Sequence, residues 1–240
     1  MFGKGKRRQR DQGSQSGVQT SALVLAVFDD VAQEEALYQA LCGVPVLART
    51  LMALHAISAI DEIIVLVREA DVFRVAGMRK DLSLNRVRKV VCAKEPGFHA
   101  LTTGVFECDL GATYIVIQDP RCPFVTAKLL NRVIHAAGQH GAAALAVPVR
   151  DTIKVVEDDV IRSTPDRASL RELQSPTVVE SSLFKAALVK AQENGLQTAE
   201  VSAILEGIGA SLRLEKGAEE NIRISNPADI SAAEAILQWR

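Results

Sequence analysis

A chain of 240 residues with 48% hydrophobic side chains is long enough to bury a large core in one or two domains. Its formal net charge of -1 provides no overall field to attract nucleic acid or a membrane surface, and an aromatic content of 4% argues against a base-stacking surface. No apolar run reaches the length of a membrane span. From the charge, the aromatic content and these short runs, we expect neither a membrane nor a nucleic acid as a partner.

The first twenty residues differ from the rest of the chain. Residues 1–20 are rich in Lys, Arg, Gln, Ser and Gly and offer little to bury, which is typical of a disordered tail. The basic cluster at residues 4–10 either contacts RNA or an acidic partner, or simply solubilises the chain. We therefore expect a basic tail followed by a single domain over residues 21–240.

Beyond the tail, short apolar runs alternate with longer amphipathic segments. Strands are expected at residues 22–28, 62–67, 86–91, 113–118, 142–147 and 211–216. Helices are expected at residues 44–57, 72–80, 97–106, 125–140, 181–194, 198–208 and 227–239. Strands separated by helix-length connections predict an α/β fold, with a Rossmann-like, mostly parallel sheet and helices on both of its faces.

Residues 148–176 break this alternation with charges and turn-forming residues. Two strand-like pieces, at residues 152–157 and 160–163, flank Asp158 and Asp159, which is typical of a β-hairpin. A hairpin that protrudes from the sheet would leave backbone and apolar side chains exposed. We therefore expect this β-arm to clasp a second copy of the chain in a homodimer.

The four cysteines are scattered along the chain without the spacing of a metal site or a redox motif. Ordinary buried thiols are the simpler interpretation. Free thiols are typical of a reducing compartment, so we expect a cytoplasmic protein.

Four sequence blocks follow one another in the domain. They are residues 43–50 (GVPVLART), 146–154 (AVPVRDTIK), 164–167 (TPDR) and 215–225 (EKGAEENIRIS). In order and spacing they are similar to consecutive blocks of the methylerythritol-phosphate cytidylyltransferases. The resemblance runs from about residue 21 to the end of the chain. It implies a Rossmann-like transferase fold with a dimerising β-arm.

Enzymes of that family join CTP to 2-C-methylerythritol 4-phosphate and release pyrophosphate, with Mg²⁺ bridging the triphosphate. The resemblance therefore implies CTP and a sugar-alcohol phosphate as substrates and Mg²⁺ as the cofactor. Such a transfer needs fixed positive charge where negative charge accumulates, and no covalent nucleophile. The family supplies this charge from a glycine-rich loop after the first strand, an Arg and a Lys near it, and a second Lys near the C-terminus.

On the sugar-phosphate side, residues 118–124 (QDPRCPF) resemble a family block that follows a strand. Asp119 matches the carboxylate that contacts the sugar alcohol and the metal. Arg121 lies one residue away from the family's arginine, whose own position is taken by Cys122. We expect Asp119 to act in catalysis and in metal binding, and Arg121 in substrate binding.

The arm and the last block supply further candidates. Thr152 and Arg167 match residues that hold the substrate phosphate across the dimer, and we assign Arg150 to the same group. Arg150 and Arg167 could instead pair with charges inside the arm. Arg223 takes the place of the family's C-terminal lysine near the reacting phosphates, which makes it the main catalytic candidate.

On the nucleotide side the chain departs from the family pattern. Residues 28–37 (FDDVAQEEAL) contain no Gly, Lys or Arg, and Leu37 stands in the place of the catalytic lysine. Four carboxylates occur where the triphosphate would bind, unless this segment simply begins a solvated helix. They are Asp29, Asp30, Glu34 and Glu35.

The second nucleotide segment of the family corresponds to residues 93–100 (AKEPGFHA). Gly97 stands at the family's arginine and Ala100 at its serine, while Lys94 could offer a charge from another position. Lys94 and Gly97 are therefore the candidate nucleotide contacts.

Three functions fit these patterns. The first is a cytidylyltransferase that acts on methylerythritol phosphate in isoprenoid precursor synthesis. The second is a catalytically inactive member of the family that serves as a binding, regulatory or heterodimer partner. The third is a cytidylyltransferase for another polyol phosphate, such as ribitol 5-phosphate.

Overall fold

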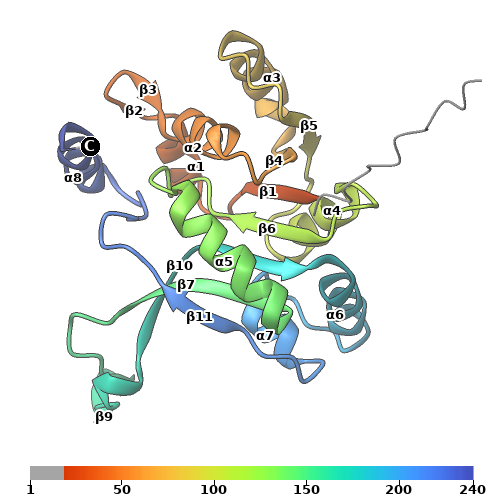
Figure 1. The fold of residues 1–240 in the computed structure, drawn as a ribbon. Coiled ribbons are helices and arrows are strands. Elements are labelled where there is room, and N and C mark those ends of the chain that lie inside the picture. Colours follow the sequence, from red (N-terminus) through yellow and green to blue (C-terminus); the bar gives the residue numbers. More distant parts are fainter. Residues whose placement is uncertain (1–18, 240) are drawn as a thin grey trace, which may run out of the picture.

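The computed structural model describes residues 19–239, which are arranged around a seven-stranded sheet (Figure 1). Its strands are β1 (Thr20–Ala26), β4 (Glu62–Val67), β5 (Val87–Cys92), β6 (Tyr114–Gln118), β7 (Ala142–Pro148), β10 (Arg171–Glu180) and β11 (Arg213–Lys216). They lie in the order β11-β7-β10-β6-β1-β4-β5. Neighbouring strands are parallel except at β10, which is antiparallel to both β6 and β7. The predicted mostly parallel α/β fold is confirmed.

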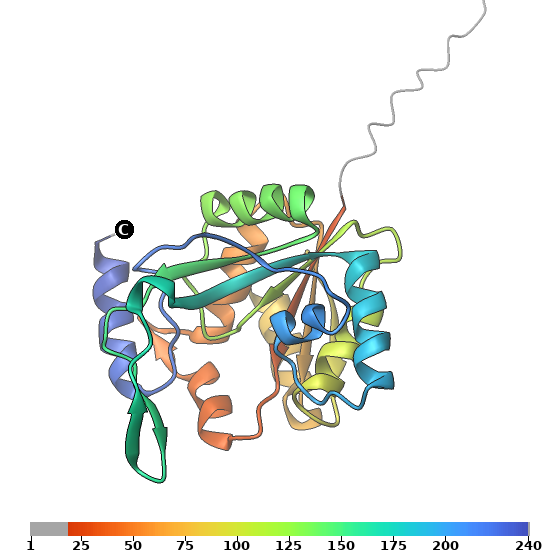
Figure 2. The same cartoon turned by 90° about the horizontal axis from the view of Figure 1, so that it is seen from below.

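Helices cover both faces of the sheet (Figures 1 and 2). Within the described residues they are α1 (Val31–Tyr38), α2 (Val46–Ala56), α3 (Val72–Asp81), α4 (Phe98–Glu107), α5 (Ala127–His140), α6 (Ser181–Glu193), α7 (Val201–Glu206) and α8 (Pro227–Gln238). Side chains of α2, α3 and α5 join one hydrophobic cluster, and those of α4, α6 and α7 join a second cluster. The sheet therefore separates two cores.

The central strands are apolar because both of their faces are buried. In β1, Ala22 and Val24 pack into the first cluster, whereas Leu23 between them packs into the second. All six residues of β4 are buried. A strand that is covered on both faces has no solvent side, so its sequence is a continuous apolar run instead of an alternating one.

The β-arm is present but shorter than expected. β8 (Val155–Glu157) and β9 (Val160–Ser163) form an antiparallel hairpin that projects from the sheet (Figures 1 and 2). The last residues of the expected arm, from Arg171 onward, belong instead to β10 in the main sheet. The segment 28–37 was expected either at the phosphate-binding position or as the start of a helix. Its residues from Val31 onward form most of α1. Two short strands, β2 (Ala40–Leu41) and β3 (Val44–Pro45), follow it.

The basic tail expected over residues 1–20 lies outside the described residues except for its last two, and Thr20 already belongs to β1. Within residues 19–239, no helix combines the length and the apolar character that a membrane crossing requires.

Candidate functional site

Two adjoining cavities lie at the edge of the sheet where β1 and β6 end. These strands are parallel neighbours, so their carboxyl ends meet at one edge, the usual place for ligands in α/β sheets. The first cavity, of about 560 Å³, is bordered by the ends of β1 and β6, the start of α1 and part of β10. The second, of about 1020 Å³, lies between β10, the β7–β8 connection and the segment before α8. Arg223 borders both cavities, together with Leu173, Gln174 and Ser175.

Hydrogen bonds hold the loop after β6, which contains Asp119. The backbone N–H of Asp119 donates to Oγ of Ser175 on β10, at 2.8 Å. Gln118 is fully buried, and its Nε2 donates to the carbonyls of Asp119 and Cys122, both at 3.0 Å. The loop is therefore tied at both of its ends, and the Asp119 carboxylate has a fixed position.

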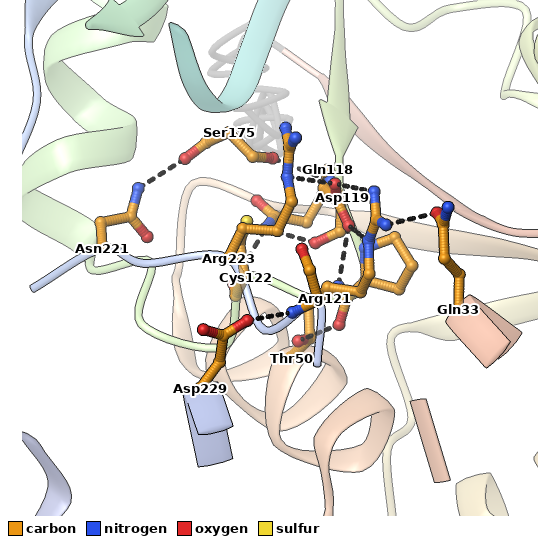
Figure 3. Close-up of polar contacts among 12 residues, drawn as sticks. Gln33, Thr50, Gln118, Asp119, Arg121, Cys122, Ser175, Asn221, Arg223 and Asp229 are labelled. Atoms are coloured by element: carbon orange, nitrogen blue, oxygen red, sulfur yellow. Dashed lines mark hydrogen bonds and ion pairs between the residues drawn. The ribbon is translucent and has the colours of Figure 1, made fainter. Parts of the chain in front are cut away.

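Asp119 lies between two guanidinium groups (Figure 3). Arg121 forms a fork with it, with Nε 3.0 Å from Oδ1 and Nη2 2.8 Å from Oδ2. Nε of Arg223 lies 2.9 Å from the same Oδ2. The side chains of Asp119 and Arg121 are 14% and 12% exposed, whereas that of Arg223 is 52% exposed. Arg223 is thus the cation of this cluster that a ligand can reach most easily.

Arg223 is held in place from several sides. The N–H of Ile224, which is fully buried, donates to the carbonyl of Arg121 at 2.9 Å. Nδ2 of Asn221, only 2% exposed, donates to the carbonyl of Ser175 at 2.7 Å. Burial alone would lower the pKa of Arg223, but the charge of Asp119 and the contact with Cys122 raise the pKa above its ordinary value. A permanent positive charge therefore lies at the junction of the cavities.

The residues expected from the sequence fall into three groups. Asp119, Arg121 and Gly97 border the first cavity, Arg150 and Arg167 border the second, and Arg223 borders both. Arg150 also pairs with Glu219, at 2.7 Å. Thr152 in the arm and Lys94 after β5 are exposed and border neither of these two cavities.

The four carboxylates of the segment after β1 do not act together. Asp30 is the N-cap of α1 and accepts from the N–H of Ala32, at 2.9 Å. Glu34 pairs with Arg68, and Glu35 borders a separate small cavity beside Tyr38. Only Asp29 and Asp30 border the first cavity.

Leu37, at the position matched to the family's catalytic lysine, is fully buried and belongs to the first hydrophobic cluster. Its side chain therefore packs in the core and presents nothing to the site. The interpretation of residues 29–35 as the beginning of a helix agrees with this structure.

The described residues do not fit a resident magnesium ion. Among residues 19–239, no group of three His, Cys, Asp or Glu side chains is placed to hold a metal. Both oxygens of Asp119, the expected metal ligand, already accept from guanidinium groups. A carboxylate paired in this way is a poor ligand for a hard cation that prefers several oxygens.

Some residues that build the site were not identified from the sequence. Gln33 and Phe28 contact Arg121, and Ser175 and Asn221 brace the two arginine-bearing segments. Asn221 lies inside the block of residues 215–225, and its place in that block is the signal that could have identified it. Nothing in the sequence pattern pointed to Gln33, because its partner is 88 residues away.

Buried amide oxygens mark the walls of both cavities. Oε1 of Gln118, beside the first cavity, and Oδ1 of Asn221, beside the second, lack a hydrogen-bond partner within the described chain. An unpaired buried polar atom costs about 1–3 kcal/mol. Each oxygen could accept a hydrogen bond from a ligand hydroxyl or from water.

Fold and site together define the class: an α/β protein with arginine-lined cavities at the carboxyl edge of a mostly parallel sheet. The chain matches the family IspD, 2-C-methyl-D-erythritol 4-phosphate cytidylyltransferase, over residues 31–239. It is 33% identical over 223 residues to the enzyme of that name from Caldanaerobacter subterraneus subsp. tengcongensis, covering 91% of this chain and 98% of the relative. It is 34% identical over 201 residues to that of Syntrophus aciditrophicus, covering 82% and 85%.

Solved structures agree in fold. The 4-diphosphocytidyl-2C-methyl-D-erythritol synthase of Anaerococcus prevotii superimposes with a TM-score of 0.80 at 23% identity, covering 92% of this chain and 99% of the other. The cytidylyltransferase of Thermus thermophilus superimposes with a TM-score of 0.73 at 21% identity, covering 90% and 98%. The chain belongs to the 2-C-methyl-D-erythritol 4-phosphate cytidylyltransferase family.

Proposed function

We propose that this chain transfers the cytidylyl group of CTP to 2-C-methyl-D-erythritol 4-phosphate and releases pyrophosphate, as its family membership supports. One observation supports the location of the reaction: Arg223 borders both cavities. Two anionic substrates bound in adjoining cavities would meet at this guanidinium.

The first cavity suits the nucleotide. Its wall combines apolar side chains of the central strands, such as Leu25 and Ile117, with polar groups at the strand ends. Gly97 borders it with a φ of 69°, a backbone conformation that favours glycine and allows close approach of a ligand. We place the base and ribose along this wall and the triphosphate toward Arg223.

The second cavity suits the sugar-alcohol phosphate. Arg150, Arg167 and Lys216 border it beside Arg223, and guanidinium groups bind phosphate oxygens in pairs. Thr152 is exposed in the arm and borders neither cavity of its own chain. We therefore assign it a substrate contact in the site of a second copy of the chain.

The reaction needs positioning more than proton transfer. An oxygen of the sugar phosphate forms a bond to the α-phosphorus of CTP, and the bond to pyrophosphate breaks with its electron pair on the leaving group. Negative charge spreads over the equatorial oxygens, and a fixed cation stabilises it. Arg223, oriented by Asp119, is that cation. Mg²⁺ belongs to the nucleotide substrate, as its magnesium complex.

We further propose that the chain forms a homodimer through the β-arm. Val155, Val156, Val160 and Ile161 are 48–60% exposed on β8 and β9. So much apolar surface on a two-stranded hairpin is best explained by burial against a second copy. The four free thiols fit a cytoplasmic location.

One observation favours a second candidate, a catalytically inactive member that binds a partner. Residues 28–37 contain no glycine and no cation, and Asp29 and Asp30 border the first cavity. A carboxylate about 4 Å from a phosphate charge repels it by roughly 4 kcal/mol at an effective dielectric of about 20.

Purified protein incubated with CTP, Mg²⁺ and either 2-C-methyl-D-erythritol 4-phosphate or ribitol 5-phosphate distinguishes these functions. We expect mass spectrometry to detect the cytidylylated methylerythritol product. A ribitol product in its place would redirect the substrate assignment, and the absence of both products from a folded protein would favour the inactive member.

A further inference from the structure

Arg121 borders the first cavity and is held from three directions, of which Figure 3 shows the contacts with Asp119 and Gln33. Its backbone N–H donates to Oδ1 of Asp119 at 2.9 Å, and its Nε and Nη2 form the fork with the same carboxylate. Its Nη1 donates to Oε1 of Gln33 at 2.6 Å. The guanidinium carbon lies 4.5 Å from the centre of the Phe28 ring. At 12% exposure, this side chain is better placed to support its neighbours than to face a ligand.

Gln33 and Phe28 belong to the segment that carries no cation of its own. Arg68, at the end of β4, bonds both to Glu34 and to the carbonyl of Phe28, which fixes the backbone of this segment. Gln33 lies on α1, in the turn before Leu37 enters the core. Its amide therefore has a defined position from which to hold Arg121.

A continuous chain of contacts crosses the cavity from α1 to Arg223. Gln33 bonds to Arg121, Arg121 to Asp119, and Oδ2 of Asp119 is shared by Nη2 of Arg121 and Nε of Arg223. Because Arg121 occupies both oxygens of Asp119, the carboxylate cannot rotate without breaking the fork. The direction of the Arg223 guanidinium then depends on that of Asp119.

We propose that Gln33 is a positioning residue, which acts through Arg121 and Asp119 to hold Arg223 toward the phosphates of a bound polyphosphate. The inference rests on the proposed function for its substrate. In this chain the segment after β1 would thus orient the cation Arg223 instead of supplying a cation itself. Phe28 contributes by covering one face of Arg121.

The test is a double-mutant cycle with Gln33→Ala and Arg121→Gln, measured in two ways. One is the rate of pyrophosphate release with CTP, Mg²⁺ and methylerythritol phosphate. The other is the affinity for inorganic pyrophosphate by calorimetry, which needs no turnover. Gln39→Ala is the control, because Gln39 ends the same helix and borders the separate small cavity but neither of the two cavities of the site. Gln33→Met keeps the length of the side chain and removes its amide oxygen, so it separates the bond to Arg121 from packing.

We expect Gln33→Ala to lower kcat/KM for CTP about tenfold, mostly through a higher KM, and to weaken pyrophosphate binding by a similar factor. In the Arg121→Gln background the same substitution should have less than about a twofold effect, because its only route is already broken. Gln33→Met should lose as much as Gln33→Ala, and Gln39→Ala should match the wild type.

Two results would overturn the inference. If Gln33→Ala reduced the rate by the same factor in the wild type and in the Arg121→Gln variant, Gln33 would not act through Arg121. A wild-type protein that binds no pyrophosphate would show that Arg223 does not face a polyphosphate. A protein that binds pyrophosphate with the predicted coupling but does not turn over would retain this inference and contradict only the proposed reaction.

Discussion

At the level of single residues, the site depends on one carboxylate between two cations. Asp119 is 14% exposed and accepts from both Arg121 and Arg223. A charge so far removed from water is tolerated because its partners are close and well oriented. Removal of the carboxylate leaves two cations side by side with no counter-charge.

Asp119→Asn keeps the shape of the side chain and removes its charge. We expect the free energy of unfolding to fall by roughly 3 kcal/mol, and pyrophosphate release to fall at least about a hundredfold. Urea denaturation and the kinetic assay measure the two effects. Asp81→Asn, at the exposed end of α3, is the matched control and should change neither. A stable and active Asp119→Asn protein would contradict the central place given to this carboxylate.

The cysteines provide an independent residue-level test. Cys42 and Cys92 are exposed, whereas Cys108 and Cys122 are buried. Burial raises the pKa of both buried thiols to about 12, with the charge of Asp119 adding to this effect at Cys122 and that of Glu62 at Cys108. At pH 8 a thiol of that pKa is almost entirely protonated and reacts slowly.

A thiol-reactive dye at pH 8 should therefore modify two cysteines quickly in the native protein and four after denaturation. Peptide mapping should place the two fast sites at Cys42 and Cys92. Rapid labelling of Cys122 in the native protein would show that the loop after β6 opens readily. This result would contradict the conclusion that hydrogen bonds hold this loop in place.

At the level of elements, most helices and strands could be predicted because periodicity and burial agree. The buried β4 is apolar after its first residue, Glu62, and α8 begins at Pro227 after the cap Asn226. β10 was missed because Pro176 and the charged residues before it suggested a loop. A register shift between Gln174 and Thr177 accommodates the proline within the ladder. Such pairing depends on the partner strands, which the local sequence does not reveal.

The candidate site could be predicted only in part. Asp119 and Arg223 were found by their place in recognisable blocks, and both lie at the cavities. Gln33 could not be predicted, because its hydrogen-bond partner Arg121 is 88 residues away in the sequence and only the tertiary fold brings the two together. The burial of Leu37 likewise follows from packing and not from local pattern.

The N-cap of α6 offers a pH-dependent prediction. Glu180 accepts from the N–H groups of Ser182 and Leu183. Burial would raise the pKa of its carboxyl, but these hydrogen bonds lower the pKa below the ordinary value of 4.5. A carboxyl with a lowered pKa in the folded state stabilises the protein above pH 4.5, and this contribution is lost as the pH falls through the folded-state pKa.

Glu180→Ala should reduce the free energy of unfolding by about 1 kcal/mol at neutral pH. The difference from wild type should shrink in a series of denaturation curves recorded at decreasing pH below 4.5. Glu206→Ala, at the exposed end of α7, is the control. A difference that stays constant across the series would rule out an ionised cap.

At the level of the whole molecule, the arm is the feature that a single chain does not explain. The hairpin of β8 and β9 projects away from the sheet (Figure 2), and its exposed apolar side chains belong to neither core of the sheet domain. In the proposed homodimer, two arms would bury each other and bring Thr152 toward a site.

Ile161→Asp tests the dimer without disturbing a core, because Ile161 is 60% exposed. By light scattering, we expect the wild type to have twice the chain mass of 25.9 kDa and the variant to have a single chain mass. Leu110→Asp, at a 92% exposed position away from the arm, should remain dimeric. A monomeric wild type, or a dimeric Ile161→Asp, would contradict assembly through the arm.

We propose that Arg223 supplies the reacting phosphates with the charge that the segment after β1 lacks. The most direct measurement is the rate of pyrophosphate release from CTP, Mg²⁺ and methylerythritol phosphate by wild type, Arg223→Ala and the exposed control Arg213→Ala. We predict turnover by wild type and Arg213→Ala, and a loss of about a hundredfold or more in kcat for Arg223→Ala. Equal turnover by all three proteins would contradict this role of Arg223, and no turnover by a folded wild type would contradict the proposed reaction.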